Sequence, residues 1–216
     1  MRLCSVEGCV KRHHANGFCD KHYHQIRDFG KIRERTKFDP NEFIIDEDVC
    51  WVILYNNKCI EVARAKFDTK YYDQISDPRL KWHLTADGYV LAFWYDENDM
   101  QHHIYLHQAI FQLSNKELQL GEVIDHKDRD PLNCLNDNLR GCTNSQNLQN
   151  RGKTINNTSG QKGVSWYAPL MKWASKIRAN NKLNHLGYFD TIEDAARAYD
   201  AAAIKLYGEF AVLNNI

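Results

Sequence analysis

The chain has 216 residues, of which 43% are hydrophobic, with 28 basic residues balanced by 28 acidic ones. This length suits one ordinary domain or two or three small modules. Because no run of about 18 apolar residues occurs and the first residues lack the apolar stretch of a secretory signal, we expect a cytoplasmic protein with no membrane partner and mostly reduced cysteines.

The zero net charge hides an uneven distribution along the chain. Residues 1–37 hold nine Lys or Arg against four Asp or Glu, residues 38–150 hold ten against nineteen, and residues 151–216 hold nine against five. Basic ends favour contacts with a polyanion, whereas an acidic middle that contains an Asp-His pair favours cation binding. For any one segment the alternative is a solvated surface of uneven charge.

The N-terminal segment, residues 1–37, has cysteines and a histidine in the pattern C-x4-C-x9-C-x2-H. Three thiolates and one imidazole make a complete tetrahedral set for Zn²⁺, and so short a segment cannot bury enough apolar surface to fold unaided. We therefore predict a zinc-stabilised basic segment; unligated cysteines in a frayed terminus are the alternative. The expected ligands are Cys4, Cys9, Cys19 and His22, with His13, His14 and His24 as rivals for the fourth position.

Residues 38–113 are predicted to form mixed strands and one helix. Residues 50–63 have the pattern of a hairpin that turns at Asn56 and Asn57, and residues 88–106 that of a hairpin that turns near residues 97–99. The stretch "LHQAIFQL", residues 106–113, has the pattern of a short helix. Three histidines here stay unassigned, because clustered histidines are more often packing or surface residues than ligands: His102, His103 and His107.

The C-terminal part begins with a polar, basic run, residues 153–162, that is predicted to be a linker. The stretches "KGVSWY", "MKWASKIRA" and "NHLGYF" then predict three short strands. They are followed by an amphipathic helix, which Thr191 and Asp194 cap and Gly208 ends. We expect a three-stranded antiparallel sheet with this helix on one face.

Alternation along residues 171–179 assigns the two faces of that sheet. One face, carrying Trp173, Ser175 and Ile177, suits the helix, and the other is basic. A narrow basic sheet fits a DNA major groove, where Arg and Lys reach guanine edges and phosphates. An ordinary solvated sheet face is the alternative.

Residues 160–214 closely resemble the Apetala, or ethylene-response-factor, type of DNA-binding domain. The residues on that family's pattern are Gly163, Val164, Trp173, Ile177, Arg178, Leu186, Gly187, Phe189, Ala195, Ala196, Tyr199, Asp200, Ala202, Ala203, Gly208 and Asn214. The family's first-strand arginines are Ser165 and Tyr167 here, so the resemblance implies the mode of docking on double-stranded DNA but not the site. The expected DNA-contacting residues are Lys153, Ser165, Tyr167, Lys172, Lys176, Arg178 and His185.

The stretch "VIDHKDRDPLNCLNDNLRGCTNSQNLQN", residues 123–150, is dense in asparagine and contains the Asp125-His126 pair. Asn138 follows His126 by twelve residues and Asn147 follows it by twenty-one. This spacing resembles the HNH nuclease motif of phage group-I-intron enzymes. The resemblance implies two antiparallel strands and a helix gripping one metal ion.

The chemistry of phosphodiester hydrolysis explains these residue types. His126 is the expected general base, because a neutral imidazole suits proton removal from water near neutral pH. Asp125 and Asn147 are the expected oxygen ligands of Mg²⁺ or Mn²⁺, and Asn138 is expected to fix the loop or the His126 ring. The remaining asparagines are expected to be turn and cap residues, and the two cysteines buried thiols: Asn133, Asn136, Asn144, Asn150, Cys134 and Cys142.

The sequence therefore predicts a modular α+β chain. Its expected parts are a zinc-stabilised segment at 1–37, a strand and helix region at 38–113, a ββα-metal nuclease centre at 114–152, a basic linker at 153–162 and a DNA-binding domain at 163–216. The whole resembles an HNH homing endonuclease that acts as a monomer on DNA, without an obligate protein partner, in the host-cell cytoplasm if a phage encodes it. The alternatives are a DNA-binding regulator with a lapsed nuclease centre and, more weakly, an RNA-binding zinc protein.

Overall fold

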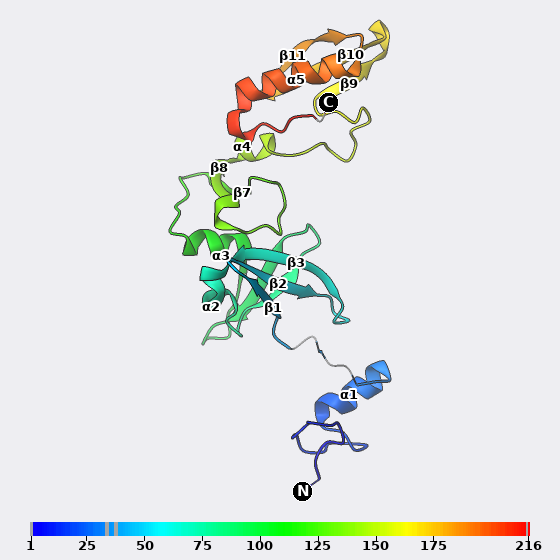
Figure 1. Ribbon diagram of the computed structural model, residues 1–216, viewed down its shortest axis with the longest axis vertical. Helices are drawn as coiled ribbons and strands as arrows, with labels where there is room; N and C mark the ends of the chain where they lie inside the picture. Colours follow the sequence, from blue (N-terminus) through cyan, green and yellow to red (C-terminus); the bar gives the residue numbers. More distant parts are fainter. Residues whose placement is uncertain (1, 33–34, 37–38, 215) are drawn as a thin grey trace. The chain divides into compact units, whose positions relative to one another are not determined.

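The computed structural model describes residues 2–32, 35–36, 39–214 and 216 (Figure 1). The strands among these residues form small antiparallel sheets, with helices between and after them. Contacts group the chain into two compact units, Met1–Pro40 with Tyr55–Val62, and Asn41–Leu54 with Ala63–Ile216. The predicted boundary between residues 37 and 38 lies outside the described residues. In the described ranges, no helix has both the length and the apolar character that a bilayer crossing requires.

The first unit contains helix α1 (Asp20–Phe29), which begins directly after Cys19. Gly30 ends α1 with φ of 69°, in the left-handed region that glycine adopts without strain. Two isolated β-bridges, Leu3 with Arg12 and Ala15 with Phe18, fold the preceding loop back on itself. The folded loop therefore lies next to the start of α1.

Two sheets form the body of the second unit. The elements, in chain order, are β1 (Phe43–Asp46), β2 (Val49–Tyr55), β3 (Glu61–Asp68), η1 (Thr69–Tyr71), α2 (Tyr72–Ile75), β4 (Lys81–Leu84), β5 (Val90–Tyr95) and β6 (Gln101–Tyr105). The order is β1-β2-β3 in one sheet and β4-β5-β6 in the other, so both predicted hairpins are confirmed. Their shared core includes Leu54, Phe67 and Trp82, each at most 1% exposed. Burial of each such side chain contributes roughly 1.5–3 kcal/mol.

The predicted short helix is confirmed as α3 (Leu106–Leu113). Leu106 and Ile110 are fully buried in the same core, because residues four apart share one helix face. Gln108 caps the start, its Oε1 accepting a hydrogen bond from the backbone N–H of Tyr105 at 3.3 Å. The first turn of α3 is thereby fixed in the core.

The nuclease-like stretch forms a two-stranded sheet and a short helix. Its elements are β7 (Glu122–His126), η2 (Asn136–Asn138), β8 (Leu139–Thr143) and α4 (Asn144–Gln149). The strands pair antiparallel, with Asp125 opposite Arg140 and His126 opposite Leu139. Leu139 is 1% exposed and anchors β8 in the core. At the helix start, Thr143 Oγ1 accepts from the backbone N–H of Gln146 at 3.3 Å.

The C-terminal domain is a three-stranded antiparallel sheet with one long helix, as expected (Figure 1). Its helix begins at Thr191, whose side chain accepts from the Asp194 N–H, and ends at Gly208, so both predicted caps are confirmed. Gly163 is required because it has φ of 75° and an added Cβ would lie 2.0 Å from the Tyr199 ring. The elements are β9 (Val164–Tyr167), η3 (Ala168–Leu170), β10 (Lys172–Ala179), β11 (Lys182–Phe189), α5 (Ile192–Tyr207) and η4 (Gly208–Phe210).

The helix-facing side of this sheet is also as predicted. Ser175 and Ile177 are at most 2% exposed, whereas Arg178 is exposed. Ala195, Ala196 and Ala203 of α5 are fully buried, since their small side chains let the helix approach the sheet closely.

The nuclease-like hairpin packs against this domain. Cys142 of β8 is 1% exposed, as a buried thiol should be, and it shares a core with Tyr199 and Tyr207 of α5. Within the predicted linker, the Lys162 Nζ donates to the carbonyl of Gln149 at 2.8 Å, and its burial lowers the pKa of that amine to about 8. The stretch 153–162 has no helix or strand, but its last residue is held in place.

Candidate functional site

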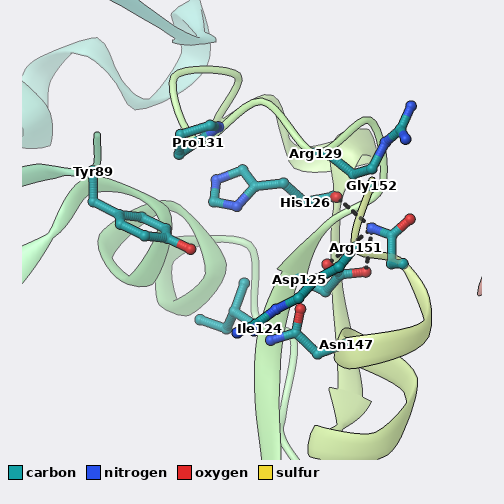
Figure 2. Close-up of a pocket in the computed structure, with 10 residues that line it drawn as sticks. Tyr89, Ile124, Asp125, His126, Arg129, Pro131, Asn147, Arg151 and Gly152 are labelled. Atoms are coloured by element: carbon teal, nitrogen blue, oxygen red, sulfur yellow. Dashed lines mark hydrogen bonds between the residues drawn. The ribbon is translucent and has the colours of Figure 1, made fainter. Parts of the chain in front are cut away.

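A cleft of about 250 Å³ opens between β7, the loop after it and α4 (Figure 2). The fold brings Asp125 and His126 to it as neighbours on β7, while Asn147 reaches it from α4. The full lining is Tyr89, Ile124, Asp125, His126, Arg129, Pro131, Asn147, Asn150, Arg151 and Gly152. Three of the four residues expected in the catalytic centre therefore lie around one cleft.

Asp125 is held more firmly than the sequence indicated. Its side chain accepts hydrogen bonds from Asn150 Nδ2 at 3.0 Å on each carboxylate oxygen, and from Arg140 Nε at 3.0 Å on Oδ2. Asn150 Nδ2 also donates to the His126 carbonyl at 2.9 Å. These bonds fix the carboxylate and the adjacent backbone in one orientation.

Arg140 continues this network into the C-terminal domain. Its Nη1 lies 3.0 Å from Glu209 Oε2, and its guanidinium carbon lies 3.7 Å from the centre of the Phe210 ring. The Arg140 side chain is only 11% exposed, so its pair with buried Asp125 is shielded from solvent. One arginine thus contacts both the cleft carboxylate and the C-terminal domain.

His126 lies in a buried, aromatic environment. Its ring centre is 5.2 Å from that of His107, edge to face, and 6.1 Å from that of Tyr89. Burial lowers the pKa of His126 below its usual value, against the opposing effect of the nearby Asp128, Asp125 and Asp130 carboxylates. The imidazole is therefore neutral near pH 7 and available to accept a proton.

His107 packs behind His126 from the first turn of α3. Burial lowers the pKa of His107 to about 4, and the His126 ring adds to the effect. Its Nδ1 is buried with no hydrogen-bond partner in the described part of the chain. Two neutral imidazoles side by side avoid the repulsion that a charged pair would suffer here.

Asn138 organises the loop that connects β7 to β8. Its Nδ2 donates to Asp128 Oδ1 at 2.8 Å and to the Asn133 carbonyl at 2.7 Å, while its Oδ1 accepts from the Asp128 N–H at 3.1 Å. Its backbone carbonyl accepts from the Lys127 N–H at 2.9 Å. Asn138 is not in the cleft lining, and it acts on the loop that follows His126.

Sequence reasoning missed several groups at this cleft. It read Asn150 as a turn or cap residue, and Asn150 does end α4, but its side chain is 5% exposed and binds Asp125. It left His107 unassigned, and it gave no role to Arg140, Arg129 or Arg151. The nearest signal was the "NLR" at residues 138–140, which places an arginine opposite Asp125 once the strands pair.

The N-terminal unit brings its four predicted metal ligands together. One ligand atom from each of Cys4, Cys9, Cys19 and His22 lies within 4.8 Å of the others. The Cys4 sulfur is 3.1 Å from His22 Nδ1, and although burial opposes ionisation, this contact helps lower the pKa of the Cys4 thiol to about 6. Three sulfurs and one imidazole nitrogen fit tetrahedral Zn²⁺.

The rival histidines have other contacts. His13 Nε2 accepts from the Gly17 N–H at 2.9 Å, and His24 Nδ1 lies 2.8 Å from the Asp20 carbonyl. His14 lies near Asp20, with 3.9 Å between Nε2 and Oδ1.

The expected DNA-contacting residues of the C-terminal sheet lie on its exposed face. Strand pairing places Tyr167 opposite Lys172, and Lys176 opposite His185. Lys172 Nζ is 3.1 Å from Asp190 Oδ1. Outside the sheet, Lys153 Nζ donates to the Gly160 carbonyl at 2.7 Å.

Comparison with known families agrees with both halves of this arrangement. Residues 104–149 match the HNH endonuclease family and residues 159–209 match the AP2 domain family. A protein of Acanthamoeba polyphaga mimivirus named as an uncharacterized HNH endonuclease is 28% identical over 86% of this chain and 92% of its own length. Protein 3.8 of Escherichia phage T7 is 33% identical over 49% of this chain and 86% of its own length. The APETALA2-like protein 2 of rice is 46% identical over 26% of this chain, which is 13% of the plant protein.

Proposed function

Because the chain is a nuclease that belongs to the HNH endonucleases and also carries an AP2 DNA-binding domain, we propose that it is a site-specific, homing-type DNA endonuclease. In this proposal the AP2 domain binds a double-stranded DNA site and the HNH centre cuts nearby, using one divalent metal ion. The chain acts as a monomer, and its single centre nicks one strand before it breaks both.

Each cleft residue has a role in this proposal. Asp125 and Asn147 supply the carboxylate and amide oxygens that Mg²⁺ or Mn²⁺ prefers, and they line the same cleft. A metal ion bound there would neutralise charge on the scissile phosphate and help the 3′ oxygen leave. His126 takes the proton from the attacking water.

The surrounding residues orient the catalytic ones. Asn138 fixes the loop after His126, and Asn150 with Arg140 orients Asp125. Arg129 and Arg151 line the cleft and suit the phosphates on either side of the cut. The N-terminal Cys4, Cys9, Cys19 and His22 hold a structural Zn²⁺.

One observation carries the proposal: a buried Asp-His pair on β7 faces the same cleft as an asparagine from the following helix. A DNA-binding regulator with a lapsed centre has no need of this set. In such a protein the asparagine and arginine that orient Asp125 would also be free to change.

A plasmid assay tests the proposal directly. With Mg²⁺, full-length protein should convert a supercoiled plasmid that carries its binding site into nicked, open-circular plasmid before linear DNA appears. His126→Ala should lower the rate at least 100-fold while DNA affinity changes little, because the substitution removes only the base. The matched control is His103→Ala, at an exposed histidine of β6 away from the cleft lining. Unchanged cleavage in EDTA, or in His126→Ala, would refute the mechanism.

A further inference from the structure

The exposed face of the C-terminal sheet is defined by its strand register. Along β10, the residues on this face alternate with Ser175 and Ile177, which face α5. Pairing then places Ser165 and Tyr188 beside Ala174, and Leu183 beside Arg178. The face comprises Ser165, Tyr167, Lys172, Ala174, Lys176, Arg178, Leu183, His185 and Tyr188.

Aromatic rings cluster on this face where Tyr167 pairs with Lys172 and Tyr188 pairs with Ala174. The Tyr167 and Tyr188 ring centres are 5.0 Å apart, and those of His185 and Tyr188 are 4.5 Å apart. Tyr167 and Tyr188 are still 37% and 40% exposed. Ala174 lies on the central strand between the tyrosines and is only 1% exposed. This burial is what we expect if the two rings cover it.

An aliphatic side chain extends this patch. Leu183 is 53% exposed and lies opposite Arg178. A single exposed leucine is ordinary, but this one lies two residues from His185 on the same strand, on a face whose basic residues are Lys172, Lys176 and Arg178. A face that combines apolar side chains with cations suits a polyanion that also presents apolar groups.

The major groove of DNA presents one such group. Among the base edges there, thymine carries a C5-methyl group, and guanine presents the acceptors that arginine and lysine bind. From Lys172 to Arg178, β10 spans about 20 Å at about 3.3 Å per residue, which corresponds to about six base pairs. The face can therefore contact several successive bases.

We propose that Tyr167, Tyr188 and Leu183 read thymine methyl groups, so that the DNA site carries thymine at two or three positions beneath them. This inference rests on the proposed function, because it assumes that the sheet docks on double-stranded DNA. It deepens that function by naming the bases the sheet selects.

Uracil substitution tests the inference, since uracil lacks only the methyl group of thymine. Full-length His126→Ala protein, which should bind without cutting, would be used to select a site from a random duplex library. Each thymine of that site would then be replaced by uracil and the Kd measured at fixed salt. We expect affinity to fall about fourfold at two or three positions, the effect of one methyl group leaving an apolar contact, and to stay constant elsewhere.

Matched variants locate the contact. Leu183→Ala and Tyr188→Ser would each be made in the same protein. In each variant, the ratio of the affinity for the thymine duplex to that for the uracil duplex (the thymine-to-uracil ratio) should fall to about one at one of those positions. Lys172→Ala, on the same face, should weaken thymine and uracil duplexes alike. Because Leu183 and Tyr188 are exposed and the Lys172 side chain is 40% exposed, thermal unfolding should show that all three variants remain folded.

The outcomes separate the inference from the proposed function. Tight duplex binding with a thymine-to-uracil ratio of one at every position overturns the inference alone, as does a ratio that survives both Leu183→Ala and Tyr188→Ser. Tighter binding to the single strands than to the duplex also overturns it, because the rings would then be stacking on unpaired bases. Failure to bind any duplex overturns the proposed function as well.

Discussion

Replacing Asn150 with alanine should damage both stability and cleavage, although the sequence indicated only a turn or cap role for this residue. The side chain donates to both oxygens of Asp125 and to the His126 carbonyl. Both Asn150 and Asp125 are 5% exposed, so water cannot easily replace the lost donor. The substitution leaves a buried carboxylate and a buried carbonyl with fewer partners.

The magnitude follows from the chemistry of the amide. An asparagine amide has two N–H groups, so the three contacts amount to two hydrogen bonds, one shared by the carboxylate oxygens. A bond to a charged group contributes about 1.5–3 kcal/mol and a neutral one about 1 kcal/mol. We therefore expect Asn150→Ala to lower the free energy of unfolding by about 3 kcal/mol. Because Asp125 is the proposed metal ligand, cleavage should fall about 10- to 100-fold, the usual effect of losing a group that orients such a ligand.

Thermal unfolding and the plasmid assay measure the two effects. A loss of about 3 kcal/mol should lower the midpoint by roughly 6–12 °C for a chain of this size. Asn144→Ala, at an exposed asparagine of the same helix, is the control and should change little. Asn150→Asp keeps the shape but sets a second carboxylate against Asp125, so it should be at least as damaging at neutral pH. If Asn150→Ala unfolds and cleaves like the unaltered protein, the network does not support Asp125 as we argue.

Three other predictions concern separate parts of the chain. The pKa of His107 is about 4 in the folded protein and about 6.5 in the unfolded chain, so the unfolded state binds the proton first as the pH falls. The free energy of unfolding should therefore fall by up to about 3 kcal/mol between pH 6.5 and pH 4. His107→Phe should lack this part of the acid sensitivity in urea unfolding, whereas His103→Phe should keep it. Metal analysis of the purified protein should find about one zinc per chain, and Cys19→Ser should release it. Folded protein that contains no zinc would contradict the site. In binding titrations, Arg178→Ala should cost about 1–3 kcal/mol of binding free energy and relax sequence selectivity. Lys153→Ala should weaken binding to all DNA sequences alike and lower its salt dependence. Equal effects of the two substitutions would contradict separate base and phosphate contacts.

The elements that the sequence predicted well have strong local signals. α3 and α5 carry apolar residues at helical spacing, and α5 also has a capping threonine and a terminal glycine. The β2–β3 and β5–β6 hairpins turn where asparagine and acidic residues interrupt apolar strands. Such signals act within a few residues of the feature they specify, so a single sequence contains them.

The missed residues depend on contacts across the fold. Asn150 and Asn144 have the same side chain and lie six residues apart, yet one is buried against Asp125 and the other is exposed. Local propensity cannot separate them, because the difference arises only when α4 packs on β7. His107 lies nineteen residues before His126, and the two rings meet only because α3 and β7 pack together. An asparagine or histidine of this kind becomes recognisable once the fold supplies its partner.

The same contacts bear on whether the nuclease and DNA-binding halves work as separate modules. The opposite charges of the central and C-terminal segments favour a division in which one half cuts and the other finds the site. Two sets of contacts argue against full independence of the halves. Arg140 binds Asp125 on one side and contacts Glu209 and Phe210 on the other. Cys142 is buried against Tyr199 and Tyr207. A chain ended near residue 153 would expose Cys142 and leave Arg140 with Asp125 alone. The C-terminal domain therefore supports the geometry of the cleft in addition to its proposed role in bringing the cleft to DNA, and its removal should reduce the rate of cutting as well as the affinity.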